Sequence, residues 1–387
     1  MVAIDASTLS FEDNLSRVSR DEELRNRTHV RSWLYFSSLV LLILVVVGGA
    51  TRLTDSGLSI TQWEPIHGVI PPLTEAQWQA ELAEYRLIPE YQLQNRGMSM
   101  AEFQFIYWWE WGHRFLARFL GLVVLIPMVF FLARRRIDPR MRPQTVGIFL
   151  LICFQGFVGW WMVSSGLTER VDVSHYRLAT HLSMAAIILA LMVWTARGLA
   201  PHAEDLKPTA WSHYAAAAVA GLALVQIWMG AMVAGMDAGL VFNEWPLMDG
   251  SFAPPADLVW LTTLGWQNWV ENPAYVQFAH RIGAYVVLAV TALHCLACWR
   301  FAPGSTHARR ATVLLGLMTA QAVVGIVTLV MAVPLNWALV HQGLAFVIFA
   351  FAIAHWRAMV GPLKLLNGST HSHAAEIRLS PVATRQA

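Results

Sequence analysis

Eight long apolar runs dominate the sequence and restrict the folds that it can adopt. Each run has about the 17 to 25 residues that a helix needs to cross a bilayer. The runs cover residues 33–50, 115–133, 145–163, 178–197, 211–233, 282–299, 311–332 and 339–359. In the whole chain 56% of the residues are hydrophobic and only 13% are charged, which leaves too little polar surface for a soluble globule of 387 residues. The sequence therefore predicts an all-α integral membrane protein with eight transmembrane helices.

Lysine and arginine are distributed unevenly between these runs. The N-terminal segment, the second, fourth and sixth connections and the C-terminal segment are basic, whereas residues 234–275 of the fifth connection contain neither Lys nor Arg. Short basic loops remain in the cytoplasm. We therefore expect both termini in the cytoplasm, and the long first and fifth connections on the outer side.

The chain contains an internal repeat. The segment "DSGLSITQWEPIHGVIPP" at 55–72 resembles "DAGLVFNEWPLMDGSFAPP" at 237–255, and "WGHRFLARFLGLVVL" resembles "FAHRIGAYVVLAV". Because each half has four spans, both halves enter the membrane in the same orientation. The repeat predicts two tandem four-helix bundles related by a pseudo-two-fold axis along the membrane normal. The expected domains are a cytoplasmic tail (1–32), an N-terminal half (33–200), a C-terminal half (201–360) and a second cytoplasmic tail (361–387).

Four histidines recur at matching depth in the two halves. They are His113 and His181 in the first half and His280 and His341 in the second, each near the outer start of an even-numbered span. An imidazole in hydrocarbon is costly and usually functional, although each ring alone suits a hydrogen-bonded packing role. Paired histidines across a helix bundle are typical of bis-histidine haem ligation. Zinc fits less well, since a tetrahedral site needs further ligands.

Other residues near these positions allow two interpretations. Small side chains beside the histidines leave room for a flat macrocycle, and they suit close helix packing equally well: Gly112, Ala117, Ala279, Gly283 and Ala284. His294 and His355 lie toward the cytoplasmic ends of their spans without counterparts in the first half, so we expect packing roles. The pair Cys295 and Cys298 lacks the following His of c-type haem attachment, and ordinary packing is favoured over a redox or metal role.

The two halves differ at one chemically important position. Glu110 stands three residues before His113, whereas Gln277 stands three residues before His280. Residues at i and i+3 share a helix face, so Glu110 is expected beside the edge of a haem on His113. The carboxylate could simply pair with Arg114, or it could be a desolvated base or a stabiliser of positive charge on the porphyrin. The second interpretation predicts chemistry in the first half and a held haem in the second.

These motifs resemble a known family. "GGATRLTDSGLSITQWEPIHGVIPP", "EWGHR" and the two "HR" helices, in a duplicated eight-span layout from about residue 31 to 359, resemble the haem A synthase family of alphaproteobacteria and mitochondria. The resemblance implies oxidation of the C8 methyl of haem O to the formyl of haem A, through a hydroxymethyl intermediate, for cytochrome oxidase biogenesis. It also implies a haem b cofactor on His280 and His341, substrate haem O on His113 and His181, and Glu110 as the catalytic carboxylate.

The resemblance extends to location and partners. It implies a bacterial inner (plasma) membrane protein with its haem sites toward the periplasm. The expected partners are haem O, the lipid bilayer, an electron acceptor that the sequence does not identify, the farnesyltransferase that forms haem O, and a second copy of the chain; no nucleic acid is expected. Arg114 and Arg281 are candidates to pair with haem propionates, and snorkelling to lipid headgroups is the alternative. The cysteine pair that some relatives carry in the first outer loop is missing here.

Two other functions remain open on the sequence. A di-haem membrane cytochrome would pass electrons and use Glu110 as a proton conduit. A transporter would also explain the repeat, but the spans show no helix broken by Gly or Pro at mid-depth. The difference between Glu110 and Gln277 favours an enzyme, because a symmetric electron carrier does not need it.

Overall fold

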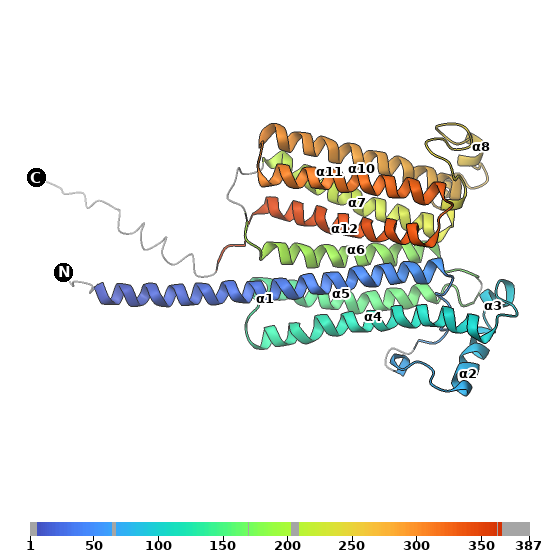
Figure 1. Ribbon diagram of the computed structural model, residues 1–387, viewed down its shortest axis with the longest axis horizontal. Coiled ribbons are helices and arrows are strands. Elements are labelled where there is room, and N and C mark those ends of the chain that lie inside the picture. Colours follow the sequence, from blue (N-terminus) through green and yellow to red (C-terminus); the bar gives the residue numbers. More distant parts are fainter. Residues whose placement is uncertain (1–5, 64–66, 169, 203–208, 362, 366–387) are drawn as a thin grey trace, which may run out of the picture.

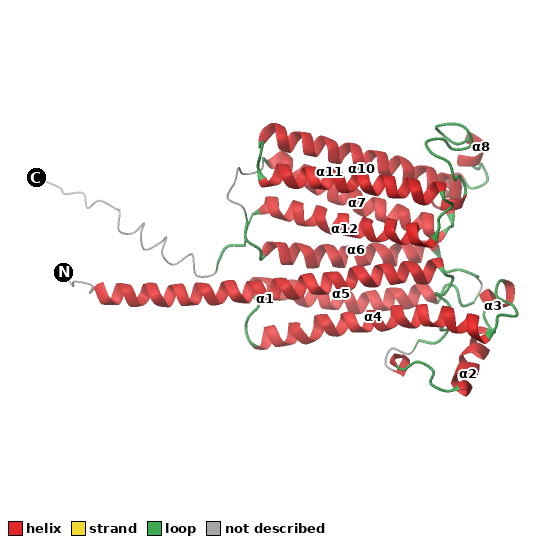
Figure 2. Cartoon of the chain, viewed as in Figure 1, coloured by secondary structure: helices red, strands yellow, loops and turns green. Residues whose placement is uncertain are grey.

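Long helices make up nearly all of the regular structure in the computed structural model, which describes residues 6–63, 67–168, 170–202, 209–361 and 363–365 (Figure 2). Among these residues, eight helices are long and apolar enough to cross a membrane, as the sequence predicts. They are α1 (Ala6–Leu53), α4 (Met100–Ala133), α5 (Arg142–Val163), α6 (His175–Gly198), α7 (Ala210–Gly235), α10 (Pro273–Phe301), α11 (Thr306–Val330) and α12 (Leu335–Val360).

Two helices begin well before the apolar runs that predicted them. α4 begins at Met100 rather than at residue 115. At this start a capping box joins the Ser99 hydroxyl and the Glu102 carboxylate to each other's backbone N–H groups. α10 begins at Pro273 rather than at 282, capped by the Asn272 side chain. Both starts are rich in aromatic residues, but polar side chains such as Glu110 and Gln277 interrupt them, so a search for continuous apolar runs does not include them. The histidine on each helix consequently lies further inside its helix than the sequence indicates.

Helix α1 also continues past its predicted boundary. Residues 18–32, expected as part of a separate tail, are the helical continuation of the first span. Arg27 in this extension donates hydrogen bonds to the carbonyl oxygens of Leu363 (2.7 Å) and Lys364 (2.8 Å), just after α12. The two ends of the helical region are therefore tied together. Most of the predicted tail 361–387 lies outside the described residues.

The eight helices pack as two rings of four. In the first ring α1 contacts α4 and α6, and α5 contacts the same two helices; in the second ring α7 contacts α10 and α12, and α11 contacts the same two. The rings meet where α6 packs against α7 and α12, and where α1 packs against α12 (Figure 1). Helices α4 and α6, like α10 and α12, consequently face each other diagonally across their rings. Their shared core is lined by residues such as Leu34, Leu189 and Phe349.

The two long connections lie at the end of the molecule opposite the start of α1 (Figure 1). The first contains α2 (Glu75–Tyr85) and α3 (Pro89–Leu93), and the second contains α8 (Ala256–Val259) and α9 (Asn268–Glu271). The first connection packs its own apolar cluster, including Trp78, Tyr85 and Phe103, against the start of α4. Both connections therefore cover the end at which the four repeated histidines lie.

Candidate functional site

The four repeated histidines face each other in pairs across the two helix rings. His113 of α4 and His181 of α6 are close enough to interact electrostatically, and so are His280 of α10 and His341 of α12. Each pair joins diagonal helices, so it lies at the centre of its ring. All four residues are only partly buried, and each ring lies against a glycine of a neighbouring helix.

Glutamine side chains hold three of the four imidazoles. The Gln155 amide nitrogen lies 3.1 Å from Nδ1 of His181 and donates to its backbone carbonyl at 2.9 Å. Gln321 makes the same two contacts, at the same distances, with His341. Sequence analysis missed these residues, although both glutamines stand in the repeated strings "FQGFVGWW" and "AQAVVGIV". Their contacts run between neighbouring helices and become visible only once the packing is known.

Gln226 supports the third imidazole, and the fourth, that of His113, lacks such support. Gln226 of α7 lies 3.0 Å from Nδ1 of His280 and donates to its backbone carbonyl at 2.9 Å. Aligning Asp55 with Asp237 places Leu44 at the corresponding position of α1. Among the described residues, His113 has no hydrogen-bonding partner. Glutamines thus hold both imidazoles of the second pair, but only His181 of the first pair.

Four glycines lie in close contact with the four imidazole rings. A Cβ atom at Gly48 or Gly159 would lie 3.0 Å from the ring of His113 or His181, and one at Gly230 or Gly325 would lie 3.2 or 2.7 Å from that of His280 or His341. A larger residue at Gly325 would require a shift, and at the other three sites it would make an unusually tight contact with the ring. The close approach of backbone to imidazole is therefore built the same way at all four positions, a pattern that sequence analysis also missed.

The surroundings of the rings fit axial ligation of haem. The buried Oε1 atoms of Gln155, Gln226 and Gln321 have no hydrogen-bond partner among the described residues. A half-turn of each amide brings Oε1 against Nδ1–H of the neighbouring imidazole, at the expense of the bond to the backbone carbonyl. That tautomer leaves Nε2 free to coordinate iron. The donor set and its orienting groups are therefore those that bis-histidine haem binding needs.

Some of the predicted small residues serve the glutamines instead. The space that a side chain at Gly283 would take is filled by Gln226, so this glycine makes room for the group that holds His280. Ala279 and Gly283 also line a cavity of about 300 Å³ between α7 and α10, together with Gln226 and Met229. A Cβ at Gly112, in contrast, would meet no atom within 4 Å.

The predicted catalytic carboxylate, Glu110, is buried and fully hydrogen-bonded. The residue is only 2% exposed. One carboxylate oxygen accepts bonds from the Ser59 hydroxyl (2.8 Å) and the Ile60 backbone N–H (2.7 Å). The other accepts from Nε (3.1 Å) and an Nη (2.6 Å) of Arg114. The first connection, with its "GLSIT" sequence, therefore wraps around the carboxylate at the position of the predicted motif.

The second half repeats this arrangement around an amide. Gln277 donates to the Phe242 carbonyl at 3.2 Å, and Arg281 donates to the carbonyls of Phe242, Glu244 and Leu247 at 2.9 to 3.1 Å. Like Arg281, the guanidinium of the matching arginine in the first half also binds loop carbonyls. Each arginine thus links the backbone of a long connection to the helix that carries a repeated histidine. Their predicted contacts with haem propionates stay a prediction.

A second buried carboxyl group lies in the first connection. Glu90 of α3 is 2% exposed, and burial raises its pKa to about 8, with the negative charges of Glu110 and Asp55 acting in the same direction. The pKa of neighbouring Tyr85 is raised as well, chiefly by burial. Glu90 is therefore largely protonated at neutral pH and lies near the predicted catalytic carboxylate. Sequence analysis missed it because nothing in a polar loop distinguishes a buried Glu from an exposed one.

Fold and site together define a class: a polytopic membrane protein in which two helix rings each carry a facing pair of histidines, beneath long connections that enclose a carboxylate in one half and an amide in the other. The chain belongs to the cytochrome oxidase assembly protein family, whose model matches residues 31–353.

Curated relatives resemble the chain over nearly its full length. A heme A synthase of Mesorhizobium japonicum is 55% identical over 90% of this chain and 95% of its own length. The heme A synthases of Rhizobium meliloti (51% identical; 90% and 94% covered) and Allorhizobium ampelinum (54%; 89% and 94%) are similar to it as well. The family expected from the sequence motifs is thereby confirmed.

Proposed function

We propose that the chain oxidises the C8 methyl group of haem O to the formyl group of haem A, through a hydroxymethyl intermediate, for cytochrome oxidase biogenesis. The observation that carries the proposal is a buried carboxylate, Glu110, on the helix face of His113, where the otherwise matching second half has Gln277. Family membership supports the reaction, since the similar relatives are named heme A synthase.

The two halves are assigned different haems. Haem O, the substrate, binds between His113 and His181, and a resident haem b binds between His280 and His341. The support is the hydrogen bonding of the rings: both imidazoles of the second pair are held by glutamines, as suits a permanent cofactor, whereas His113 is not held and suits a ligand that exchanges. The identical packing order of the two rings supports a pseudo-two-fold relation between the halves.

The reaction requires four electrons to leave the substrate and one oxygen atom to enter. Water attacks the oxidised methyl carbon, two electrons and two protons leave, and a hydroxymethyl group results. A second round gives a gem-diol, which loses water to become the aldehyde. The resident haem b supplies one-electron redox chemistry when bound. The final electron acceptor, docking of the haem O-forming farnesyltransferase and self-association stay predictions.

The contacts of Glu110 favour an electrostatic role. A carboxylate offers about four lone-pair sites, and here four N–H or O–H donors already occupy them. The group is therefore rigidly fixed, in an ion pair with Arg114, and is suited to stabilise positive charge that develops at the porphyrin edge. To orient the attacking water, it would have to lose one of these four bonds. Proton abstraction would first require one donor, such as the Ser59 hydroxyl, to turn away.

The proposed orientation has both termini in the cytoplasm of a bacterial cell and the haem pairs toward the periplasm. It is supported by the basic segments at one end of the helices and by the outer connection without Lys or Arg at the other.

The function is tested by haem analysis. We would express the chain in a bacterial host that makes haem O but no haem A, extract membrane haems, and separate them by reverse-phase chromatography with mass detection. A formyl haem or its hydroxymethyl precursor, absent from the host without the chain, is expected. Unchanged haem O from a folded, haem-loaded protein would contradict the proposal and favour an electron-transfer cytochrome.

A further inference from the structure

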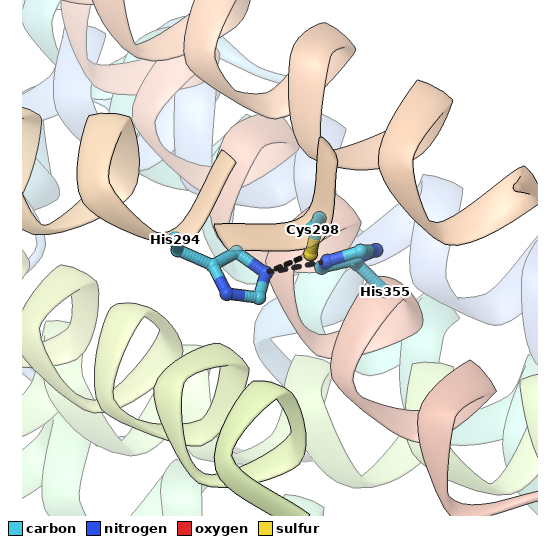
Figure 3. Close-up of side chains that lie close together, drawn as sticks. All are labelled: His294, Cys298 and His355. Carbon is cyan, nitrogen blue, oxygen red and sulfur yellow. Dashed lines mark hydrogen bonds between the residues drawn. The ribbon is translucent and has the colours of Figure 1, made fainter. Parts of the chain in front are cut away.

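A second group of potential ligands lies in the C-terminal ring, away from the four repeated histidines. His294 and Cys298 of α10 and His355 of α12 point toward one another (Figure 3). The two imidazole Nε2 atoms are 2.9 Å apart, and Sγ of Cys298 is 3.7 Å from Nε2 of His294. The three residues are 1 to 3% exposed. Their ligand atoms all lie within 4.8 Å of one another.

The position of this group follows from helix periodicity. His294 comes fourteen residues after His280, and His355 comes fourteen residues after His341. Fourteen residues are nearly four turns, so the second pair repeats on the same helix faces, about 21 Å along the axis. Cys298 follows His294 by four residues and shares its face. Two diagonal helices thus carry two separate histidine pairs, one toward each end of the ring.

The fold itself does not require the second pair. Aligning His113 with His280 puts Pro127 and Phe131 where His294 and Cys298 stand, and aligning His181 with His341 puts Thr195 at the position of His355; no ligand group is found there. The first ring packs with these residues in the corresponding places. A hydrogen bond joins the two rings, as suits the packing role expected from the sequence, but that role does not require a thiol to converge on the same point in the second half alone.

We propose that His294, Cys298 and His355 bind one Cu(I) ion. An ion about 2.0 Å from each Nε2 and about 2.3 Å from Sγ holds such donor atoms some 3 to 4 Å apart, close to the separations present. Imidazole and thiolate both suit copper, and thiolate selects its monovalent state. Met359, a further soft donor, packs in the same buried cluster as Cys298.

Charge favours copper over zinc at this position. One thiolate and two neutral imidazoles neutralise Cu(I) completely, whereas Zn(II) would leave a positive charge in a buried, membrane-spanning site. His307 and Arg310 of α11 also interact electrostatically with His355, and the guanidinium adds to the repulsion of a dication. Zinc moreover prefers four protein ligands in a closed site, while three converge here.

The burial of these rings argues against a second haem. Bis-histidine haem ligation needs the plane of a macrocycle between two imidazoles, but His294 and His355 are in direct contact and almost completely buried. His280 and His341, in contrast, are only partly buried. Cys298 also forms no disulfide with Cys295, because Sγ of Cys295 lies 3.6 Å from the Thr312 hydroxyl instead.

The site is tested on the purified, haem-loaded full chain. After removal of loosely bound metal with a chelator, we would titrate Cu(I) anaerobically against a cuprous chelator and determine copper per chain by mass spectrometry. One tightly bound copper per chain is expected, and X-ray absorption at the copper edge should show one sulfur and two nitrogen ligands. This measurement uses the unaltered protein, so it does not depend on a variant that folds.

Substitutions then locate the site. Cys298→Ser and His355→Ala should each weaken Cu(I) binding at least tenfold and leave haem absorbance unchanged, whereas Cys295→Ser, the matched control, should bind copper normally. Equal loss in Cys295→Ser, no stoichiometric copper, or an absorption spectrum without sulfur would overturn the proposal. Tighter binding of Zn(II) than of Cu(I), or a haem on these histidines, would overturn the assignment to copper.

Discussion

The two long connections are bound to their helices by matching arginines around different side chains. In each half an arginine one helical turn beyond the buried acid or amide donates to loop carbonyls, Arg114 in the first and Arg281 in the second. The enclosed group is Glu110 in one half and Gln277 in the other. The arginine contacts are thus common to both halves. The enclosed groups bond the loop differently: Glu110 accepts from Ser59 and Ile60, whereas Gln277 donates to the Phe242 carbonyl.

A second difference concerns how firmly the histidines are held. Gln226 supports His280, whereas the corresponding position in the first half is Leu44, and His113 has no hydrogen-bond partner among the described residues. A resident cofactor gains from ligands fixed on both sides, and a substrate that must leave does not. In the proposed assignment, the same scaffold thus retains a cofactor in one half and lets a substrate exchange in the other.

The largest effect is expected from removing the carboxylate. Glu110→Gln copies the amide that the second half already tolerates, so the variant should fold and bind haem. Formation of the formyl haem should fall about 100-fold or more, since a preorganised charge in a buried site is lost. Chromatography of extracted haems measures it. The mirror variant Gln277→Glu should retain most activity, and normal turnover in Glu110→Gln would refute the proposed role.

Loss of a supporting glutamine should come next. Gln226→Leu gives the second half the residue of the first, and should weaken retention of the resident haem by about ten- to a hundredfold, because ligand orientation is lost. Transfer of haem to an excess of a haem-scavenging apoprotein measures the rate. Gln155→Leu removes the supporting glutamine of the first half and should leave the resident haem in place; equal loss in both variants would remove the distinction.

The reverse change should have a smaller effect. Leu44→Gln offers His113 the hydrogen bond that it lacks, and we expect product release to slow several-fold while the chemical step is retained. Single-turnover and steady-state rates, measured on the same preparation, separate the two. Leu39→Gln places an amide on the exposed face of α1 as a control. An unchanged release rate in Leu44→Gln would mean that the support of the ring does not set exchange.

The smallest effect concerns the pH dependence of stability. Glu90 has a pKa of about 8 in the folded protein, above its value of about 4.5 in the unfolded chain. Its contribution to stability is therefore complete below pH 4.5 and is lost as the pH rises through 8. Glu90→Gln should reduce the fall in melting temperature between pH 6 and 9 by a few degrees. The exposed Glu84→Gln is the control, and identical pH profiles would contradict the assigned pKa.

The sequence predicted what depends on periodicity and missed what depends on packing. Eight apolar runs fixed the number of spans, and the repeat aligned four histidines and exposed the Glu110 difference. The early start of α4 was missed because polar side chains such as Glu110 interrupt it. Gln226 and Gly48 were missed because their contacts cross between helices. The convergence of His294 with His355 was missed because it has no counterpart in the first half to mark it.

The division of labour between the halves is tested most directly by counting haem in matched variants. We would purify His113→Ala and His280→Ala from a host that makes haem B but no haem O, and determine haem per chain by pyridine haemochrome analysis against protein concentration. The account predicts that His113→Ala keeps its resident haem b, whereas His280→Ala loses it. Haem retained in His280→Ala and lost in His113→Ala would contradict the assignment of cofactor and substrate to the two halves.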